Sequence, residues 1–135
     1  AYQERCVSDI KQKLQKLKVE KDSYTFYIEK LLEDNYLNED RYVKYYVAAH
    51  VKKKWGKAKM KSALMGKRIN PEIIKTYLDD MDTQEYDLQI KAVAEKKWPC
   101  IKGKTNRDRK TKLMRFLLSK GYEMDKVIRS IKEIE

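Results

Sequence analysis

Three segments of the chain repeat one arrangement of residues and align with one another without a gap. They are residues 31–46 (LLEDNYLNEDRYVKYY), 63–78 (ALMGKRINPEIIKTYL) and 116–131 (FLLSKGYEMDKVIRSI). In each, an apolar residue is followed five positions later by a second apolar or aromatic residue: Leu32 and Leu37, Leu64 and Ile69, Leu117 and Tyr122. A cap-like polar residue then precedes an acidic one: Asn38 and Asp40, Asn70 and Glu72, Glu123 and Asp125. Because such pairs are typical of helix N-termini, the pattern predicts three equivalent points at which one helix ends and the next begins.

A second repeat also indicates tandem helical units. Two lysines precede tryptophan both in VKKKWG, which contains Trp55, and in AEKKWP, which contains Trp98. The chain holds only four glycines and two prolines, too few for a β-sandwich, a β-barrel or a glycine-rich nucleotide loop, and helix-forming residues dominate. We therefore predict an all-α protein, an elongated right-handed or curved array of tandem units of two to three helices, each burying one face against the next.

Caps and apolar spacing predict where the first helices lie. Ser8 is the expected N-cap of one helix, and a second should run from about residue 23 to residue 34. A third should begin after Asn38 and continue for about 18 residues until Gly56 stops it. Lysines in its last turn complement the helix dipole.

Apolar stripes on the predicted helices, from the third helix to the end of the chain, form the predicted core. Its members are Tyr42, Val43, Tyr46, Val47, Leu64, Ile73, Ile74, Tyr77, Leu113, Phe116, Leu117, Val127 and Ile131. Trp55 and Trp98 each complete an apolar stripe, so we expect them to anchor a helix against the next unit; stacking on nucleic-acid bases is the alternative. Ten tyrosines against two phenylalanines predict a thin core in which many rings keep a hydroxyl near water.

Residues that catalysis or metal binding would need are scarce. His50 is the only histidine, and no Ser-His-Asp or Cys-His arrangement is apparent, so a packed or surface histidine is the simpler interpretation. Cys6 and Cys100 are isolated, which favours two reduced, partly buried cysteines over a disulfide or a zinc site. We expect a binding protein with no enzymatic activity, no metal and no cofactor.

One run of acidic residues lies between predicted helices: Asp79, Asp80, Asp82, Glu85 and Asp87. The run lacks the glycine turn and the bidentate glutamate of a calcium loop, so we predict a solvated connection with a helix cap at Asp82 or Thr83. No apolar run approaches the roughly 18 residues that span a bilayer, and no secretory leader is visible. We therefore expect a cytoplasmic protein with no membrane contact.

Positive charge is the strongest functional signal. Thirty-two Lys and Arg against 21 Asp and Glu leave a net charge of +11, which an anionic partner would offset. Two basic clusters lie at predicted junctions between units: Lys52, Lys53, Lys54, Lys57, Lys59 and Lys61 form the first cluster, and Lys102, Lys104, Arg107, Arg109, Lys110 and Lys112 form the second. Turns between stacked helices tend to gather on one side, so we expect both clusters on one surface that meets phosphates or acidic protein patches. The alternative is a pair of solvated helix ends favoured by the dipole.

Three motifs follow one another in a recognisable order. SDIKQKL comes first, DNYLNEDRYVKYYVAAHVKKKWGKAKMKSAL lies in the centre, and KLMRFLLSKGYEMDKVIRSI closes the chain. Together they resemble the RecX family, bacterial regulators of the recombinase RecA. In its central signature a Gly-Tyr-Leu-Asp-Asp turn leads into an aromatic-rich helix, a basic segment, a glycine and a helix ending in Leu-x-x-Lys-Gly-Ile. The resemblance extends from about Cys6 to Ile131 and is carried by all three motifs.

His50 and Val51 stand where the family is often arginine-rich, so the basic face is expected to begin later here, and three further positions also depart from the family pattern. Asn35 replaces the usual turn glycine and tolerates the same left-handed conformation. Arg68 replaces the glycine of Leu-x-x-Lys-Gly-Ile, and Gly66 stands two positions earlier, so we expect a rearranged end of that helix. Lys54 replaces a glycine before Trp55, which should let the third helix run further.

The resemblance implies three tandem three-helix repeats. We place them at residues 1–55, with the N-terminal helix clipped, at 56–98, and at 99–135, which includes the basic linker. It also implies a non-enzymatic protein that lies in the groove of the RecA–DNA filament, bridges protomers and promotes filament shrinkage. Such a protein inhibits strand exchange, ATP hydrolysis and coprotease activity, thereby regulating DNA repair, recombination and the SOS response. Separately, we expect a monomer.

The residues expected to contact the filament and its single- or double-stranded DNA are the two basic clusters together with Arg68. A stand-alone basic DNA-binding module, architectural or transcriptional, is the alternative function. A helical scaffold that binds only acidic proteins is a third. Base reading would need Arg, Asn or Gln on a recognition helix, whereas these clusters are mostly lysine in or near turns, which suits phosphates.

Overall fold

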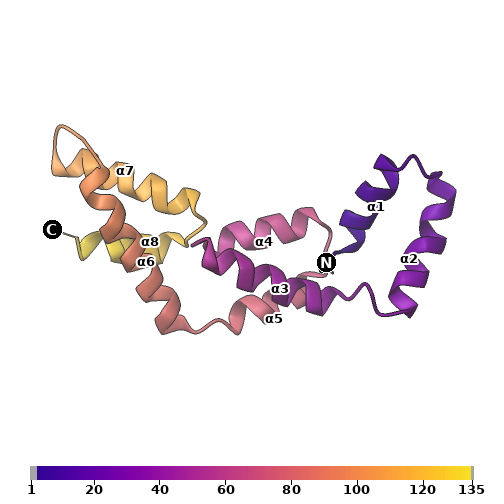
Figure 1. Ribbon diagram of the computed structural model, residues 1–135. Helices are drawn as coiled ribbons and strands as arrows, with labels where there is room; N and C mark the ends of the chain where they lie inside the picture. Colours follow the sequence, from indigo (N-terminus) through magenta and orange to yellow (C-terminus); the bar gives the residue numbers. More distant parts are fainter. Residues whose placement is uncertain (1–2, 135) are drawn as a thin grey trace. The chain divides into compact units, whose positions relative to one another are not determined.

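The computed structural model describes residues 3–134, and over this range the chain is helical (Figure 1). Its helices are α1 (Val7–Lys16), α2 (Tyr24–Glu33), α3 (Glu39–Lys52), α4 (Lys57–Gly66), α5 (Pro71–Asp79), α6 (Thr83–Lys97), α7 (Asn106–Ser119) and α8 (Met124–Lys132). Single 3₁₀ turns, η1 (Lys21–Ser23) and η2 (Trp98–Cys100), precede α2 and follow α6. The predicted all-α class is confirmed.

The chain divides into two compact units. The first unit holds the described residues up to Ala49 together with Ala63–Asp79, and the second unit holds His50–Ser62 together with the described residues from Asp80 onward. The helices α3 and α4 therefore contribute residues to both units. The division into three repeats, with boundaries after residues 55 and 98, stays a prediction.

The first unit buries apolar side chains from α3, α4 and α5. They include Tyr42, Val43, Tyr46, Val47, Leu64, Ile74 and Leu78. An ion pair joins α1 to the end of α4, since the Lys67 ammonium lies 2.6 Å from the Asp9 carboxylate. Burial acts to raise the pKa of Asp9, but the hydrogen bonds from Lys67 and from the Cys6 N–H outweigh it and lower that pKa. The pair is therefore ionised at neutral pH.

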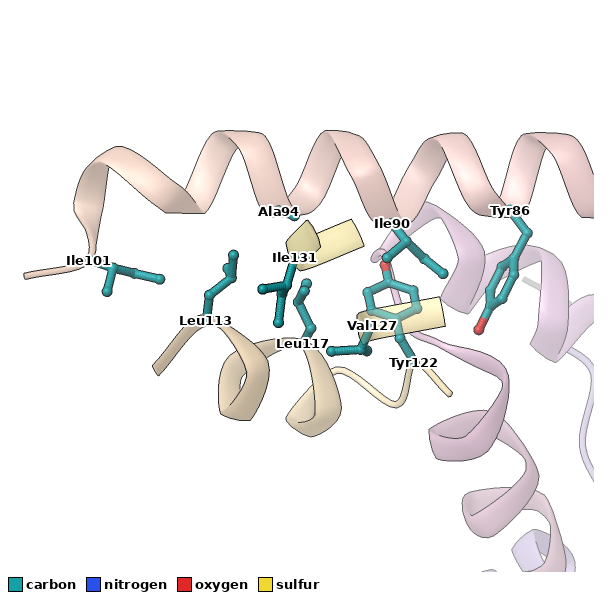
Figure 2. Packing of buried hydrophobic residues seen from close by; sticks show 9 residues of the cluster. All are labelled: Tyr86, Ile90, Ala94, Ile101, Leu113, Leu117, Tyr122, Val127 and Ile131. Atoms are coloured by element: carbon teal, nitrogen blue, oxygen red, sulfur yellow. The ribbon is translucent and has the colours of Figure 1, made fainter. Parts of the chain in front are cut away.

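The second unit packs α6 against α7 and α8 around one apolar cluster (Figure 2). Its buried members are Tyr86, Ile90, Ala94, Ile101, Leu113, Leu117, Tyr122, Val127 and Ile131. Burying a side chain of this size stabilises a fold by about 1.5–3 kcal/mol, so the cluster supplies much of the unit's stability. The predicted core residues Leu113, Leu117, Val127 and Ile131 are buried as expected.

Some predicted core residues are only half-buried. These are Ile73, Tyr77, Phe116 and the two tryptophans, Trp55 and Trp98. Conversely, Tyr86 and Ile90 on α6 are almost completely buried but were not among the predicted core residues. The apolar periodicity therefore predicted which helices form the core, but it did not predict how deeply each side chain is buried.

Five helices, α1, α2, α3, α4 and α7, end in the same backbone motif. One residue past the C-cap has a positive φ in each case: Lys18, Asn35, Lys54, Arg68 and Gly121. The N–H of the next residue donates a hydrogen bond to a carbonyl near the end of the helix. The donor and acceptor pairs are Val19 and Leu14, Tyr36 and Leu31, Trp55 and His50, Ile69 and Leu64, and Tyr122 and Leu117. This is the Schellman motif, which satisfies carbonyls that a helix end leaves free.

The repeated motif corrects two expectations about helix ends. Lys54 does not extend the third helix, because it adopts φ 66° and α3 ends at Lys52 with 14 residues, before Gly56. Arg68 does not rearrange the end of α4, because it takes the glycine's left-handed conformation at φ 59°. A non-glycine residue there costs about 1–2 kcal/mol, which the two returning hydrogen bonds offset.

Two further expectations about the repeat and the first cap change. Leu31, not Leu32, supplies the carbonyl that corresponds to those of Leu64 and Leu117, and Leu32 is 48% exposed. The first segment thus has one extra residue in its turn. Ser8 is not a cap, because α1 already begins at Val7 and Cys6 precedes it as the N-cap residue.

Three other predicted caps are confirmed by side-chain hydrogen bonds, whereas Glu123 is the N-cap residue of α8 but makes no side-chain cap bond. The side chains of Asn38 and Asn70 accept the N–H groups of Arg41 and Glu72, each at 2.9 Å, and Asp82 accepts that of Glu85 at 3.0 Å. Within the acidic run, Asp80 and Asp82 lie in the connection between α5 and α6, as predicted, whereas Asp79 belongs to α5 and Glu85 and Asp87 belong to α6. Both cysteines are free, but only Cys6 is buried, whereas Cys100 at the end of η2 is exposed.

Candidate functional site

The first basic cluster surrounds the turn between α3 and α4, and backbone hydrogen bonds hold this turn against the turn between α7 and α8. The Gly56 N–H donates to the Lys120 carbonyl at 2.7 Å, and the Ala58 N–H donates to the Gly121 carbonyl at 3.0 Å. A Cβ atom on Gly56 would lie 2.2 Å from the carbonyl carbon of Gly121. Only glycine permits so close an approach of two backbones.

Two tyrosine hydroxyls fix the same turn from inside the second unit. The Tyr122 hydroxyl donates to the Lys54 carbonyl at 2.6 Å. The Tyr86 hydroxyl accepts the Lys57 N–H at 2.9 Å and donates to the Glu123 carboxylate at 2.6 Å. Burial raises the pKa of both tyrosines, and for Tyr86 the hydrogen bond to Glu123 raises the pKa further. Both hydroxyls therefore stay protonated at physiological pH and can serve as fixed hydrogen-bonding groups.

The lysine side chains of this turn remain largely in solvent while its backbone is held. Four of them are exposed: Lys52, Lys53, Lys54 and Lys61. The other two lie over aromatic rings, with the Lys57 ammonium 4.9 Å from the Tyr86 centroid and the Lys59 ammonium 4.2 Å from the Trp55 centroid. The rings of His50 and Trp55 form a T-shaped pair with 4.4 Å between their centroids, so this histidine is a packed residue, one of the two predicted alternatives. The exposed lysines thus project from a rigid support.

The second basic cluster lies on the loop after η2 and on the first turns of α7. Arg109 donates from Nε to the Ile101 carbonyl and from Nη2 to the Trp98 carbonyl, both at 3.0 Å. Its guanidinium also stacks 3.8 Å from the centroid of the Trp98 ring. The Lys112 ammonium donates to the Lys102 carbonyl at 2.6 Å. Arg109 and Lys112 therefore hold the loop, and Lys102, Lys104 and Arg107 are the exposed members of the cluster that no such bond occupies in the structure.

The two clusters lie at opposite ends of α7. The first contacts the turn that follows this helix, and the second includes the loop that precedes it. A helix of 14 residues is about 21 Å long, which sets the scale of their separation. The clusters therefore do not form one continuous patch of adjacent lysines.

A groove along α6 and α7 runs between these two ends. It has a volume of about 440 Å³ and is lined by Lys54, Gln89, Ala92, Val93, Lys96, Lys97, Cys100, Phe116 and Lys120. Lys54 belongs to the first cluster, and Cys100 precedes the loop of the second. Three of its lysines, Lys96, Lys97 and Lys120, were not predicted as site residues. The repeated lysine pair before tryptophan in AEKKWP was the signal that pointed to two of them.

Arg68 belongs to the first unit, whereas the residues of both clusters belong to the second. It is exposed and lines a groove of about 380 Å³ whose other lining residues are Cys6, Val7, Ser8, Lys11, Glu39, Lys67 and Ile69. Within this unit Arg68 therefore lies near Lys11 and Lys67. The presence of Glu39 makes this groove less uniformly basic than the groove along α6 and α7.

Neither a metal centre nor a membrane span is found in the part of the chain that the structure describes. Residues 3–134 contain no group of three or more His, Cys, Asp and Glu side chains placed to hold a metal ion. No helix within the same range is long and apolar enough to cross a bilayer.

Comparisons with known proteins agree on one family. A family model described as "RecX, third three-helix domain" matches residues 85–130, which contain most of α6 and α8 and all of α7. The regulatory protein RecX of Clostridium perfringens (strain 13 / Type A) is 34% identical over 119 residues, covering 87% of this chain and 56% of the relative. That of Vibrio parahaemolyticus is 34% identical over 96 residues, covering 71% and 61%. The chain thus spans little more than half the length of these relatives.

Solved structures extend the similarity to the fold. The crystal structure of RecX from Lactobacillus salivarius superposes with a TM-score of 0.80 at 25% sequence identity, covering 98% of this chain and 87% of that chain. A second crystal structure, of a regulatory protein RecX, gives a TM-score of 0.87 at 23% identity and supports the fold alone.

Proposed function

The chain belongs to the RecX family, and from this premise we propose that it regulates a bacterial RecA recombinase by binding, without catalysing a reaction. In this proposal the protein lies in the groove of the RecA–DNA filament and inhibits strand exchange, ATP hydrolysis and coprotease activity. Its contribution to DNA repair and recombination is then the control of how long filaments persist.

The turn between α3 and α4 is the observation that supports this proposal most strongly. Five hydrogen bonds join its backbone, or the residues beside it, to Tyr86, Lys120, Gly121 and Tyr122, while four lysines stay exposed. Holding the support in advance reduces the conformational entropy that binding must remove. Lysine ammonium groups act as point charges and suit phosphates or carboxylates better than base edges.

A RecA assay tests the proposal directly. We expect the protein, at amounts below those of RecA, to inhibit ATP hydrolysis on single-stranded DNA and strand exchange. Replacing Lys52, Lys53 and Lys54 together with glutamate should remove this inhibition, while circular dichroism shows unchanged helix content. If about six exposed lysines neutralise phosphates, affinity for the filament should also fall about 10³-fold between 50 and 200 mM salt.

A matched variant controls for charge alone. Lys13, Lys16 and Lys18 are exposed lysines of α1 and the turn after it, so their replacement by glutamate changes the net charge equally. This control should inhibit like the unmodified protein at moderate salt. Equal loss of inhibition in both triple variants would contradict a specific role for the turn. Tight duplex binding with no effect on RecA would instead favour a stand-alone DNA-binding module.

A further inference from the structure

The groove along α6 and α7 combines an apolar floor with a rim of positive charge. We propose that it binds an acidic peptide segment of a partner protein, one in which carboxylates flank one or two bulky aliphatic side chains. The site shares only Lys54 with the turn between α3 and α4 and needs no nucleic acid, so the inference goes beyond the proposed regulation of RecA.

The floor of the groove suits aliphatic side chains. Ala92 and Val93 on α6 face the same groove as Phe116 on α7. Its volume of about 440 Å³ lies within the range of about 300–1,000 Å³ that is typical of ligand pockets. A bulky aliphatic residue placed there would remove apolar surface of both partners from water, which is the main favourable contribution to such binding.

The rim of the groove selects for negative charge. Lys54, Lys96, Lys97 and Lys120 line it, and none of the described residues that line it is acidic. The two sides of the groove therefore both present ammonium groups, so that carboxylates on either side of a docked aliphatic residue would meet a lysine. This complementarity raises the association rate and disfavours neutral or basic segments.

The aromatic side chain of the groove argues against a single-stranded nucleic acid as the occupant. Bases bind non-specifically by stacking on open aromatic faces. Phe116 is half-buried, and the Lys97 ammonium already lies 4.7 Å from its ring centroid. The remaining floor is aliphatic, and the rim has no arginine on which a base could stack. Aliphatic insertion between carboxylate contacts fits these surfaces better than base stacking.

Fluorescence anisotropy with the full chain tests the inference. The probe is a short labelled peptide in which glutamates flank a pair of leucines; in one control peptide serine replaces both leucines, and in another glutamine replaces every glutamate. We expect a Kd of about 10–100 µM at low salt for the probe, and binding at least about fivefold weaker for either control peptide.

Two groove variants and one matched control identify the site. Lys96→Glu reverses a rim charge, and Ala92→Glu places a carboxylate on the floor, where it can pair with Lys96 four residues later and preserve α6. Each should weaken peptide binding about fivefold to tenfold. Lys91→Glu changes another exposed lysine of α6, one that lines a different groove with Asp87 and Lys126, and should leave the affinity unchanged.

Three results would overturn the inference. No detectable binding of the glutamate–leucine peptide at millimolar concentration would do so, as would equal weakening by Lys91→Glu and Lys96→Glu, which would indicate non-specific attraction. Binding of labelled oligothymidylate that Lys96→Glu and Ala92→Glu weaken, in the absence of peptide binding, would assign the groove to nucleic acid. Because RecA is absent from this assay, its outcome is separate from that of the inhibition assay.

Discussion

At the turn between α3 and α4, backbone groups make the contacts that hold the segment in place, whereas at the loop between η2 and α7 a basic side chain makes them. Gly56 and Ala58 donate to carbonyls of the facing turn, which leaves the neighbouring lysines in solvent. Arg109 instead uses its own donors on the Ile101 and Trp98 carbonyls. Similar runs of basic residues therefore have different amounts of charge free for a partner.

The contacts of the two tryptophans show the same difference between the turn and the loop. Each has a cation over its ring: the Lys59 ammonium at 4.2 Å from the Trp55 centroid and the Arg109 guanidinium at 3.8 Å from the Trp98 centroid. Cation–π contacts of this kind contribute about 0.5–2 kcal/mol depending on burial. The Lys59 ammonium makes only this ring contact among the described residues, whereas Arg109 combines its ring contact with two hydrogen bonds, so the guanidinium contributes more to holding its segment.

The largest expected effect comes from breaking the backbone contact at the first turn. Gly56→Ala would place its Cβ 2.2 Å from the backbone of Gly121, so one of the two turns must move. We expect a loss of about 3 kcal/mol in the free energy of unfolding and a Tm lower by about 10 °C, measured by chemical and thermal denaturation.

Gly66→Ala is the matched control, because Gly66 is the last residue of α4 and a Cβ there would meet no atom within 4 Å apart from its chain neighbours and its own helix backbone. This variant should be stabilised by about 0.5–1 kcal/mol, since alanine favours the helix. If Gly56→Ala were as stable as the unmodified protein, the close packing of the two turns would not be an essential contact.

The next largest effect on stability should come from the loop between η2 and α7. Arg109→Lys keeps the charge but loses the planar fork that reaches two carbonyls and stacks on Trp98, so we expect unfolding to be easier by about 2 kcal/mol. Arg107→Lys, an exposed neighbour on α7, should change stability by less than about 0.5 kcal/mol. Urea denaturation of both variants would measure the difference, and equal stability would show that the charge of Arg109 matters more than its geometry.

Removal of the Tyr86 hydroxyl should have a smaller effect on the turn between α3 and α4. Tyr86→Phe leaves the Lys57 N–H without its acceptor and Glu123 without its donor, which should reduce stability by about 1–2 kcal/mol at pH 7.

The same variant predicts a pH dependence. Because burial and Glu123 raise the folded-state pKa of Tyr86, its stabilising contribution is fully present below the unfolded pKa of 10.0 and is lost as pH rises above that value. The stability difference between the unmodified protein and Tyr86→Phe should therefore narrow between pH 9 and pH 11, by about 1 kcal/mol. Denaturation at a series of pH values measures this, and a constant difference would argue against titration of Tyr86.

The smallest effects on stability should come from exposed lysines beside the turn between α3 and α4 and in the loop between η2 and α7. Lys53→Ala and Lys104→Ala each remove a side chain that the fold leaves in solvent, and we expect both to change the free energy of unfolding by less than about 0.5 kcal/mol. A loss above 1 kcal/mol from either would show that its side chain supports the junction, as that of Arg109 does.

Much of the helical organisation was predictable because it depends on neighbouring residues. Asn38, Asn70 and Asp82 cap helices as their side-chain chemistry predicts. The repeated segments also indicated equivalent helix ends, although the register of Leu32 was wrong by one residue. Helix ends at Lys54 and Arg68 were predicted less well, because a lysine or arginine in the left-handed conformation has no local signal that distinguishes it from one that continues a helix.

The candidate site was predictable only in part. Basic residues could be counted from the sequence, but their availability could not, because the hydrogen bonds of Arg109 and Lys112 depend on carbonyls that the folded loop brings near them. Lys96, Lys97 and Lys120 were missed for the same reason, since they meet only when α6 and α7 pack side by side.

By itself the sequence determined the all-α class, most helix starts, the excess of positive charge and the resemblance to one family, because each follows from composition, short-range spacing or motif order. Tertiary structure alone decided that Gly56 meets Gly121, that Tyr86 bonds to Lys57, and that lysines from separate helices share one groove. These contacts join residues far apart in the chain, and their energies depend on distances that only packing sets.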